Sequence, residues 1–247
     1  MLGQYSRVFK TVEMDSSFYA IPRREVMERI ASMVPPDFVF SAKVPKVITH
    51  ESMLRNRDSD SINLKMFESA LEPIRGKLKL IVIQLPPKFD YSHRDDLEAF
   101  LRLCSDTGFR TATEFRHASW LEEERMQASF DILRRNDSSY VAVDEPLLPP
   151  LCVKTASPVY VRMHGRGSGL WYDYRYSKDE MIRWAEKVRG FVVDGDEVIV
   201  VFNNHPHGNA PLNALEFMRL LDGKAQNKTE ISDTTGVATL DEFIHRK

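Results

Sequence analysis

The chain has 247 residues, 43% of them hydrophobic, so it is long enough to bury a core without disulfides or metals. Its 34 Lys and Arg nearly balance 36 Asp and Glu, which argues against a general electrostatic attraction to nucleic acid or an anionic membrane. Cys104 and Cys152 lie far apart without metal-type spacing, and this fits a reducing compartment. The N-terminus has no apolar signal segment, and the longest uncharged apolar stretch, 80–87, is far below the roughly 20 residues that span a bilayer. We therefore predict a cytoplasmic protein without a membrane segment.

Seven short segments rich in β-branched and aromatic residues are predicted as strands. They span residues 11–19, 38–45, 78–87, 111–117, 140–145, 159–165 and 197–204. Helical periodicity fills the intervals, and two helices are predicted to open on capping boxes, Ser119 with Glu122 and Ser177 with Glu180. The strands recur about every 31 residues, the size of a strand with its crossover helix. This alternation predicts a parallel α/β fold in a single domain, 1–222, followed by a polar C-terminal tail, 223–247.

The polarity of alternate strand positions distinguishes two parallel architectures. An open sheet covered by helices on both faces is apolar at all positions, whereas a barrel turns alternate residues into a lumen with a polar C-terminal mouth. The apolar set, predicted to face helices, includes Val12, Met14, Phe38, Phe40, Ala42, Val44, Ile81, Ile83, Leu85, Val141, Val143, Val159, Val161, Met163, Val198, Val200 and Phe202. The polar set is Glu13, Asp15, Ser17, Ser41, Lys43, Gln84, Glu114, Arg116, Asp144, Arg162, His164 and Asn203. We predict a TIM-barrel-like (β/α) barrel, and the lack of a G-x-G-x-x-G motif or P-loop weakens the nucleotide-fold alternative.

Six motifs carry a family likeness. They are VEMDSSFYAIP at 12–22, FVFSAKVPKVITH at 38–50, LIVIQLPPKF at 80–89, TEFRHASW at 113–120, VYVRMHGR at 159–166 and VFNNHPHGNAPLNAL at 201–215. In this order and spacing they resemble the YecE-like family, domain of unknown function 72. The resemblance implies a TIM-barrel-type fold, a cytoplasmic prokaryotic protein and no established activity. A likeness of that fold to metal-dependent barrels is analogy only, because fold does not imply function.

One unit of the family pattern is missing. The family normally begins with a strand carrying an Ile-Gly-Thr/Cys-Ser-Gly-Trp-like motif, and only seven of the eight expected strands are encoded here. Either the start codon is assigned internally, or the barrel is naturally open or closed by other means. Open edges on the first and last strands invite pairing with another chain, so self-association through them is one expectation.

The polar set predicts a site at the barrel mouth. Its cations offer donors for a phosphate or carboxylate, so the expected ligand is an anionic small molecule or a nucleic acid. The predicted catalytic residues are Glu114 and Asp144, as general base or acid, and His164, as a proton shuttle. The predicted substrate-binding residues are Glu13, Lys43, His50, Arg116, Arg162, Arg166, Trp171, Asn203 and Asn204, with Trp171 in an aromatic loop suited to stacking on a base or sugar.

Other chemistries receive less support from the sequence. His164, His205 and His207 are metal-ligand types, but the interleaved Lys and Arg would repel a cation, so no metal site is predicted and the cofactor stays unknown. There is no G-x-S-x-G elbow, and Cys104 falls in a helical run.

Three functional interpretations stay open. The first is an enzyme that uses general acid/base chemistry on an anionic substrate, either phosphorylated or derived from nucleic acid. The alternative is a non-catalytic ligand- or nucleic-acid-binding barrel, in which the polar lumen groups satisfy one another as a structural network. A lesser alternative is a metal-dependent hydrolase or nuclease. The sequence does not identify a substrate, a reaction or an oligomeric state.

Overall fold

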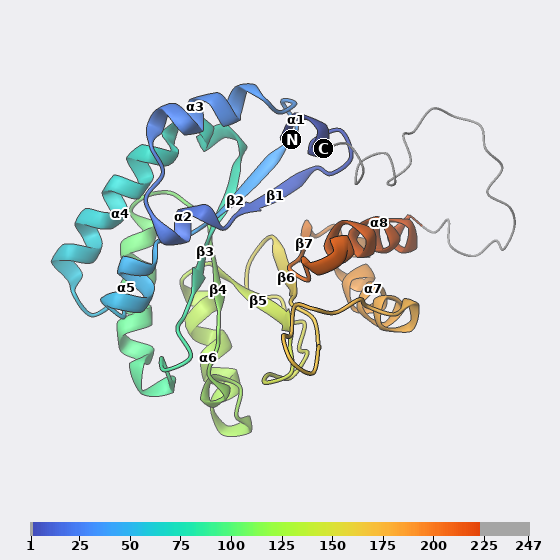
Figure 1. Cartoon of the computed structure of the whole chain (residues 1–247). Helices are drawn as coiled ribbons and strands as arrows, with labels where there is room; N and C mark the ends of the chain where they lie inside the picture. Colours follow the sequence, from blue (N-terminus) through green and yellow to red (C-terminus); the bar gives the residue numbers. More distant parts are fainter. Residues whose placement is uncertain (1, 223–247) are drawn as a thin grey trace, which may run out of the picture.

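The computed structural model of the chain describes residues 2–222 (Figure 1). Seven strands alternate with helices along these residues. The strands are β1 (Thr11–Met14), β2 (Val39–Lys43), β3 (Leu78–Gln84), β4 (Thr111–Glu114), β5 (Ser138–Asp144), β6 (Val159–Met163) and β7 (Val198–Phe202). The α-helices are α1 (Leu2–Tyr5), α2 (Ser16–Tyr19), α3 (Arg24–Ser32), α4 (Arg57–Leu71), α5 (Arg94–Ser105), α6 (Glu123–Arg135), α7 (Lys178–Val193) and α8 (Asn209–Leu221). Short turns of other helix types lie at Val47–Glu51, Glu72–Lys77, Tyr91–His93, Ala118–Trp120 and Pro206–Gly208.

The strands form one parallel sheet in the order β1-β2-β3-β4-β5-β6-β7, curled into a nearly closed barrel with helices around it. This confirms the predicted TIM-barrel-like fold with seven strands. Each strand lies where the sequence predicts one, but most end earlier, and residues 16–19 form α2 rather than more of β1. The polar tail predicted for 223–247 lies outside the described residues.

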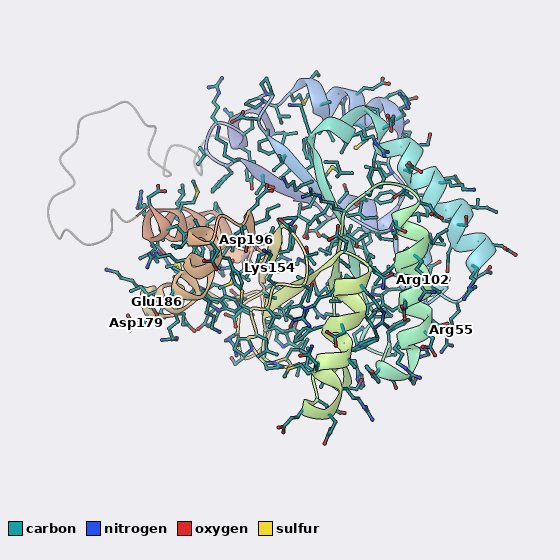
Figure 2. All side chains as sticks on the ribbon, turned by 180° about the vertical axis from the view of Figure 1, so that it is seen from behind. Arg55, Arg102, Lys154, Asp179, Glu186 and Asp196 are labelled. Atoms are coloured by element: carbon teal, nitrogen blue, oxygen red, sulfur yellow. The ribbon has the colours of Figure 1, made fainter. Side chains whose placement is uncertain are left out.

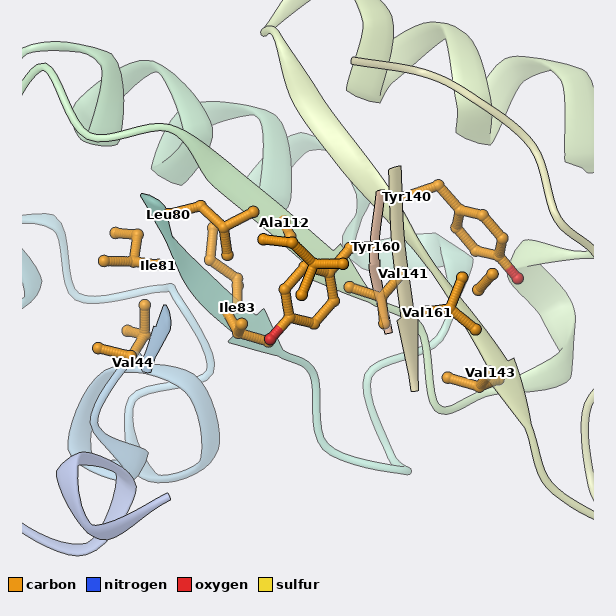
Figure 3. Close-up of a cluster of buried hydrophobic side chains, with 14 of the residues drawn as sticks. Val44, Leu80, Ile81, Ile83, Ala112, Tyr140, Val141, Val143, Tyr160 and Val161 are labelled. Carbon is orange, nitrogen blue, oxygen red and sulfur yellow. The ribbon is translucent and has the colours of Figure 1, made fainter. Parts of the chain in front are cut away.

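Alternate strand residues separate the outer core from the lumen. Phe202 packs on Phe217 of α8, and Ile81 and Ile83 are fully buried beneath the helices, as their positions predict. On β5 the predicted orientation is wrong. Tyr140 packs on Phe130 of α6, so Val141 and Val143, on the opposite side, face the lumen rather than helices (Figure 3).

Helix starts follow local hydrogen bonding. At α7 the predicted capping box is confirmed, since Ser177 accepts from the backbone N–H of Glu180 while the Glu180 carboxylate accepts from the backbone N–H of Ser177. At α6 the prediction is wrong, because Ser119 lies in a preceding 3-10 turn. There its hydroxyl accepts from the backbone N–H of Tyr91 and contacts the His117 ring, so α6 begins at Glu123 without that box.

The barrel is open between its first and last strands. No strand ladder joins β1 to β7 within residues 2–222, and a cavity of about 490 Å³ lies between them. Its wall is mainly apolar, from β7, α8 and the chain before β1, and it reaches Glu13, Asp15 and Asn203 of the predicted lumen set. The gap has an edge strand on both sides, and self-association through these edges stays a prediction.

Charged side chains populate the outer faces of the helices. Figure 2 shows Arg102, Asp179 and Glu186 at the periphery, and Lys154 beside Asp196, with which it forms an ion pair. Among the described helices, none is both long enough and apolar enough to cross a membrane.

The capping box gives a stability prediction. Replacing Ser177 with Ala removes both the hydroxyl acceptor of the Glu180 amide and a partner of the Glu180 carboxylate. We expect Ser177→Ala to lower the free energy of unfolding by about 1 kcal/mol in urea titrations. Ser32→Ala is the control, because the exposed Ser32 hydroxyl bonds only to the Arg29 carbonyl within its own helix end. Equal effects of the two substitutions would contradict the assignment.

Candidate functional site

Arg162, on β6, lies at the centre of the lumen and is completely buried. Its Nη2 is 2.6 Å from Glu13 Oε1 on β1, and its Nη1 bonds to Glu114 Oε2 on β4. Burial alone would lower the pKa of Arg162, but the two carboxylates raise it. The guanidinium therefore stays charged and connects opposite walls of the barrel.

A second side chain of β6, Tyr160, also binds Glu13. The Tyr160 hydroxyl donates to Glu13 Oε2 at 2.8 Å, and the Ser41 hydroxyl lies 2.7 Å from the Tyr160 oxygen. Because Tyr160 gives its only proton to Glu13, Ser41 is the donor in the second bond. Burial raises the pKa of Glu13 despite the opposing charges of Arg162 and Lys43.

Lys43 and His50 form the β2 side of the mouth. Lys43 Nζ is 2.7 Å from Asp15 Oδ1 and 4.0 Å from Glu13 Oε1. The His50 ring packs edge-on against Phe18, with the two ring centroids 4.9 Å apart. Burial, together with Lys43, Arg116 and Lys88, lowers the pKa of His50, so its ring is neutral and the surrounding potential is positive.

Glu114 is the carboxylate with the most partners. Besides Arg162, its Oε1 accepts from Gln84 at 2.7 Å and from Arg116 Nη1 at 3.0 Å, and His164 Nε2 lies 3.5 Å away. Burial would raise the pKa of Glu114, but Arg162, His164 and Arg116 hold it well below the usual range. A carboxylate so firmly ionised is a weak proton acceptor near neutral pH.

Glu145, the residue after β5, is a site residue that the sequence analysis missed. It is 1% exposed, and its Oε2 is 3.1 Å from Arg116 Nη1. Within residues 2–222 neither of its carboxylate oxygens accepts a hydrogen bond of good geometry. Burial raises the pKa of Glu145 to about 7, with Glu114 adding to the rise and Arg116 opposing it. This carboxyl group is therefore able to gain or lose its proton near neutral pH.

A signal for Glu145 was present in the sequence. The segment 140–145 reads YVAVDE, and assigning Tyr140 to the helix side would have turned Glu145 into the lumen. Two adjacent acidic residues at a strand end admit either choice, because alternate side chains point to opposite faces.

Arg116 is a partly exposed cation that contacts Glu114 and Glu145 through one nitrogen. Its side chain is 17% exposed, and every ion pair or hydrogen bond that it makes within the described residues uses Nη1, to Glu114 and Glu145. Its guanidinium lies 5.7 Å from the ring centre of Trp171. Nη2 and Nε are therefore donors without a protein acceptor among residues 2–222.

His164 lies between Glu114 and the β7 end of the mouth. Its Nδ1 is 3.5 Å from the Asn203 amide nitrogen, and its side chain is 11% exposed. Burial, with Arg162 and Arg116 adding to the effect, lowers the pKa of His164 even though Glu114 opposes them. The imidazole is thus neutral at pH 7 and able to accept a proton.

Asp144, Arg166 and Asn204 lie apart from this lumen network. Asp144 accepts from Arg166 Nε at 2.6 Å and from Trp184 of α7 at 3.1 Å, so both of its oxygens are engaged on the helix side. The fully buried Asn204 donates to the Tyr174 carbonyl at 2.8 Å and to Asn213 of α8 at 2.9 Å. These contacts anchor the loop after β6, so the described partners of Asp144 and Asn204 are structural.

Of the predicted site residues, nine surround one mouth. They are Glu13, Lys43, His50, Glu114, Arg116, Arg162, His164, Trp171 and Asn203. In residues 2–222 no group of three or more His, Cys, Asp or Glu is arranged to hold a metal ion.

Two arginine substitutions separate the buried network from the mouth. Arg162→Met leaves Glu13 and Glu114 without their shared cation, so we expect the free energy of unfolding to fall by about 3–5 kcal/mol. Arg116→Met leaves Glu114 paired with Arg162 and Gln84, and we expect a fall of about 1 kcal/mol. Urea unfolding at pH 7 measures both. A larger loss for Arg116→Met would contradict the central place of Arg162.

Glu145 gives a pH-dependent prediction. Its pKa of about 7 exceeds the ordinary value of 4.5, so the folded state holds the proton more tightly and stability falls as pH rises from about 4.5 to 7. Gln cannot ionise, so Glu145→Gln does not lose this stability. The free energy of unfolding of the variant minus that of the parent chain should therefore increase by about 2 kcal/mol from pH 5 to pH 8. The exposed Glu51→Gln provides the baseline. A difference that does not vary with pH would show that Glu145 is not shifted.

The sequence of the chain matches a protein family and several curated proteins. The family model described as "Protein of unknown function DUF72" matches residues 1–236. The UPF0759 protein YunF of Bacillus subtilis (strain 168) is 28% identical over 245 residues, covering 90% of this chain and 86% of YunF. The UPF0759 protein YecE of Escherichia coli (strain K12) is 30% identical over 127 residues, covering 50% of this chain and 45% of YecE.

Solved structures agree with these sequence matches. A DUF72 family protein from Enterococcus faecalis V583 superposes with a TM-score of 0.81 at 27% identity, covering 90% of this chain and 93% of that one. Another, from Thermotoga maritima MSB8, superposes with a TM-score of 0.75 at 30% identity, covering 90% and 88%. The motifs, the barrel and the family match over most of the chain agree, and the chain belongs to the DUF72 family.

Proposed function

We propose that the barrel mouth binds a small anion-bearing molecule and transfers a proton to or from it. The observation that carries this proposal is the Glu114–Arg116–Glu145 cluster. One guanidinium nitrogen, Nη1, contacts two carboxylates, and Nη2 and Nε have no protein acceptor among residues 2–222. Two N–H donors on a planar edge suit bidentate contact with a phosphate or carboxylate.

Charge around the mouth supports an anionic ligand. Lys43, Lys88 and Arg116 act together on His50, and both His50 and His164 are neutral. An incoming anion therefore meets a positive rim, while the buried carboxylates Glu13 and Glu114 lie deeper, against Arg162.

The proton-transfer role goes to Glu145 and His164. Glu145, with a pKa of about 7, exchanges a proton near neutral pH, and the neutral His164 ring can accept one. In this scheme Glu114 positions Arg116 and Arg162 rather than taking a proton, and Asp144 with Arg166 supports the loop after β6. Among the residues first expected to be catalytic, His164 keeps its proposed role.

A non-catalytic binding barrel is the second candidate. Three cations are already paired, Lys43 with Asp15, Arg162 with Glu13 and Glu114, and Arg166 with Asp144. A network satisfied to this degree fits a structural lumen in which only the Arg116 edge meets ligand. The cytoplasmic location stays a prediction from the sequence.

Binding and turnover separate the two candidates. Ribose 5-phosphate is the binding probe in isothermal titration, and we expect Arg116→Met to weaken its affinity at least tenfold. Arg102→Met, which removes an arginine from the outer face of α5, is the matched control. Loss of affinity in both variants, or in neither, would contradict the Arg116 contact.

Turnover is measured on a panel of sugar phosphates and nucleoside monophosphates in D₂O. Proton and phosphorus NMR report solvent deuterium incorporation and phosphate release. Glu145→Gln should slow any reaction about a hundredfold while changing the ribose 5-phosphate Kd less than threefold. Binding that depends on Arg116 without turnover of any panel member would favour the non-catalytic barrel.

A further inference from the structure

The loop after β6 places an aromatic ring against the Arg116 guanidinium. Trp171 lies in this loop, and its indole centre is 5.7 Å from the Arg116 guanidinium. Trp171 is half-buried, and the flanking Leu170 and Tyr172 are 56% and 46% exposed. The other two tryptophans are buried and engaged, Trp120 on Phe115 and Trp184 on Asp144.

The loop is built to hold this position. Gly165 has φ +97°, and a Cβ there would lie 2.3 Å from the Trp171 carbonyl oxygen, so only glycine permits the approach. The Gly167 N–H donates to the same carbonyl at 3.1 Å. The Tyr176 hydroxyl accepts from the Gly165 N–H at 2.7 Å. These contacts fix the backbone of Trp171, and the residue as a whole is half-buried.

An indole on a fixed backbone, next to an arginine with free donors, suits one chemical class of ligand. An apolar planar surface on a ligand stacks on the indole, and an anionic group attached to it meets Nη2 and Nε of Arg116. An anion without a ring, such as a sugar phosphate, uses only the second contact.

We propose that the ligand of the mouth is an anionic group carried on a planar ring, with the ring stacked on Trp171 and the anion bound by Arg116. This inference rests on the proposed function and adds the substrate class. Nucleotides have this chemistry, either as free nucleoside monophosphates or as the ends of single-stranded nucleic acid. Trp171 is then a specificity residue, and Glu145 acts beside the bound anion.

The experiment compares ligands with and without the ring. Isothermal titration measures Kd for AMP, ribose 5-phosphate and a six-nucleotide single-stranded DNA with a 5′-phosphate. In the parent chain AMP should bind about tenfold tighter than ribose 5-phosphate. In Trp171→Ala the two should bind equally, and Trp171→Phe should keep most of the preference. Tyr19→Ala, which removes a 72% exposed ring from the end of α2, is the control and should change nothing.

Each outcome decides between the proposals. Equal Kd values for AMP and ribose 5-phosphate in the parent chain, or a preference that survives Trp171→Ala, would overturn the ring-stacking inference alone. Affinities that do not change in Arg116→Met, or no measurable binding of any probe, would overturn the proposed function as well. Tighter binding of the oligonucleotide than of AMP, lost in Trp171→Ala, would assign the ring to a nucleic-acid end, and the reverse order would assign it to a free nucleotide.

Discussion

The ion pairs of Arg162 are the constraint on which the rest of this barrel depends. The guanidinium is completely buried and touches carboxylates from β1 and β4, so it connects strands that do not pair with each other. A buried charge of this kind is tolerated when opposite charges compensate it. Arg162 helps to hold Glu114 ionised, and Glu13 bonds to the same guanidinium although burial raises its pKa. Tyr160 donates to Glu13, and Gln84 and Arg116 donate to Glu114.

This arrangement determines which groups are left for chemistry. Because Glu114 is held ionised, we assign proton exchange to Glu145, at the end of the next strand. There the neighbouring charges offset the effect of burial on the pKa less completely. Arg116 lies between them and contacts both carboxylates through Nη1. Its Nη2 and Nε are therefore the part of the network that can meet a ligand. The Arg116 guanidinium thus belongs both to the structural network and to the proposed ligand site.

Much of the fold follows from the sequence, because strand periodicity and the polarity of alternate positions are local signals. Glu13, Lys43 and Arg162 lie in the lumen because they occupy alternate strand positions with an apolar residue on either side. Glu114 occupies the corresponding position between Thr113 and Phe115. The failure on β5 has a physical cause. Val141 and Val143 are as apolar as a helix-facing residue, but the barrel wall there is itself lined by valines, and the aromatic Tyr140 takes the helix side. One reversed strand was enough to select Asp144 and miss Glu145. The capping box predicted at Ser119 is wrong because the Ser119 hydroxyl bonds to the backbone of Tyr91 in a neighbouring loop. A local capping pattern does not encode such a long-range contact.

The same polar network bears on the open side of the barrel. No backbone ladder connects β1 with β7 in the described part of the chain, so the hydrogen bonds that normally close such a barrel are missing there. Side chains of β6 reach past β7 instead: Tyr160 and Arg162 both bind Glu13, at 2.8 and 2.6 Å, and so hold β1 from inside the lumen. The cavity between β1 and β7 ends at this carboxylate. Glu13 is therefore at once the inner wall of the gap and the partner of the central arginine. In this barrel the closure of the fold and the preparation of the mouth depend on the same buried ion pairs.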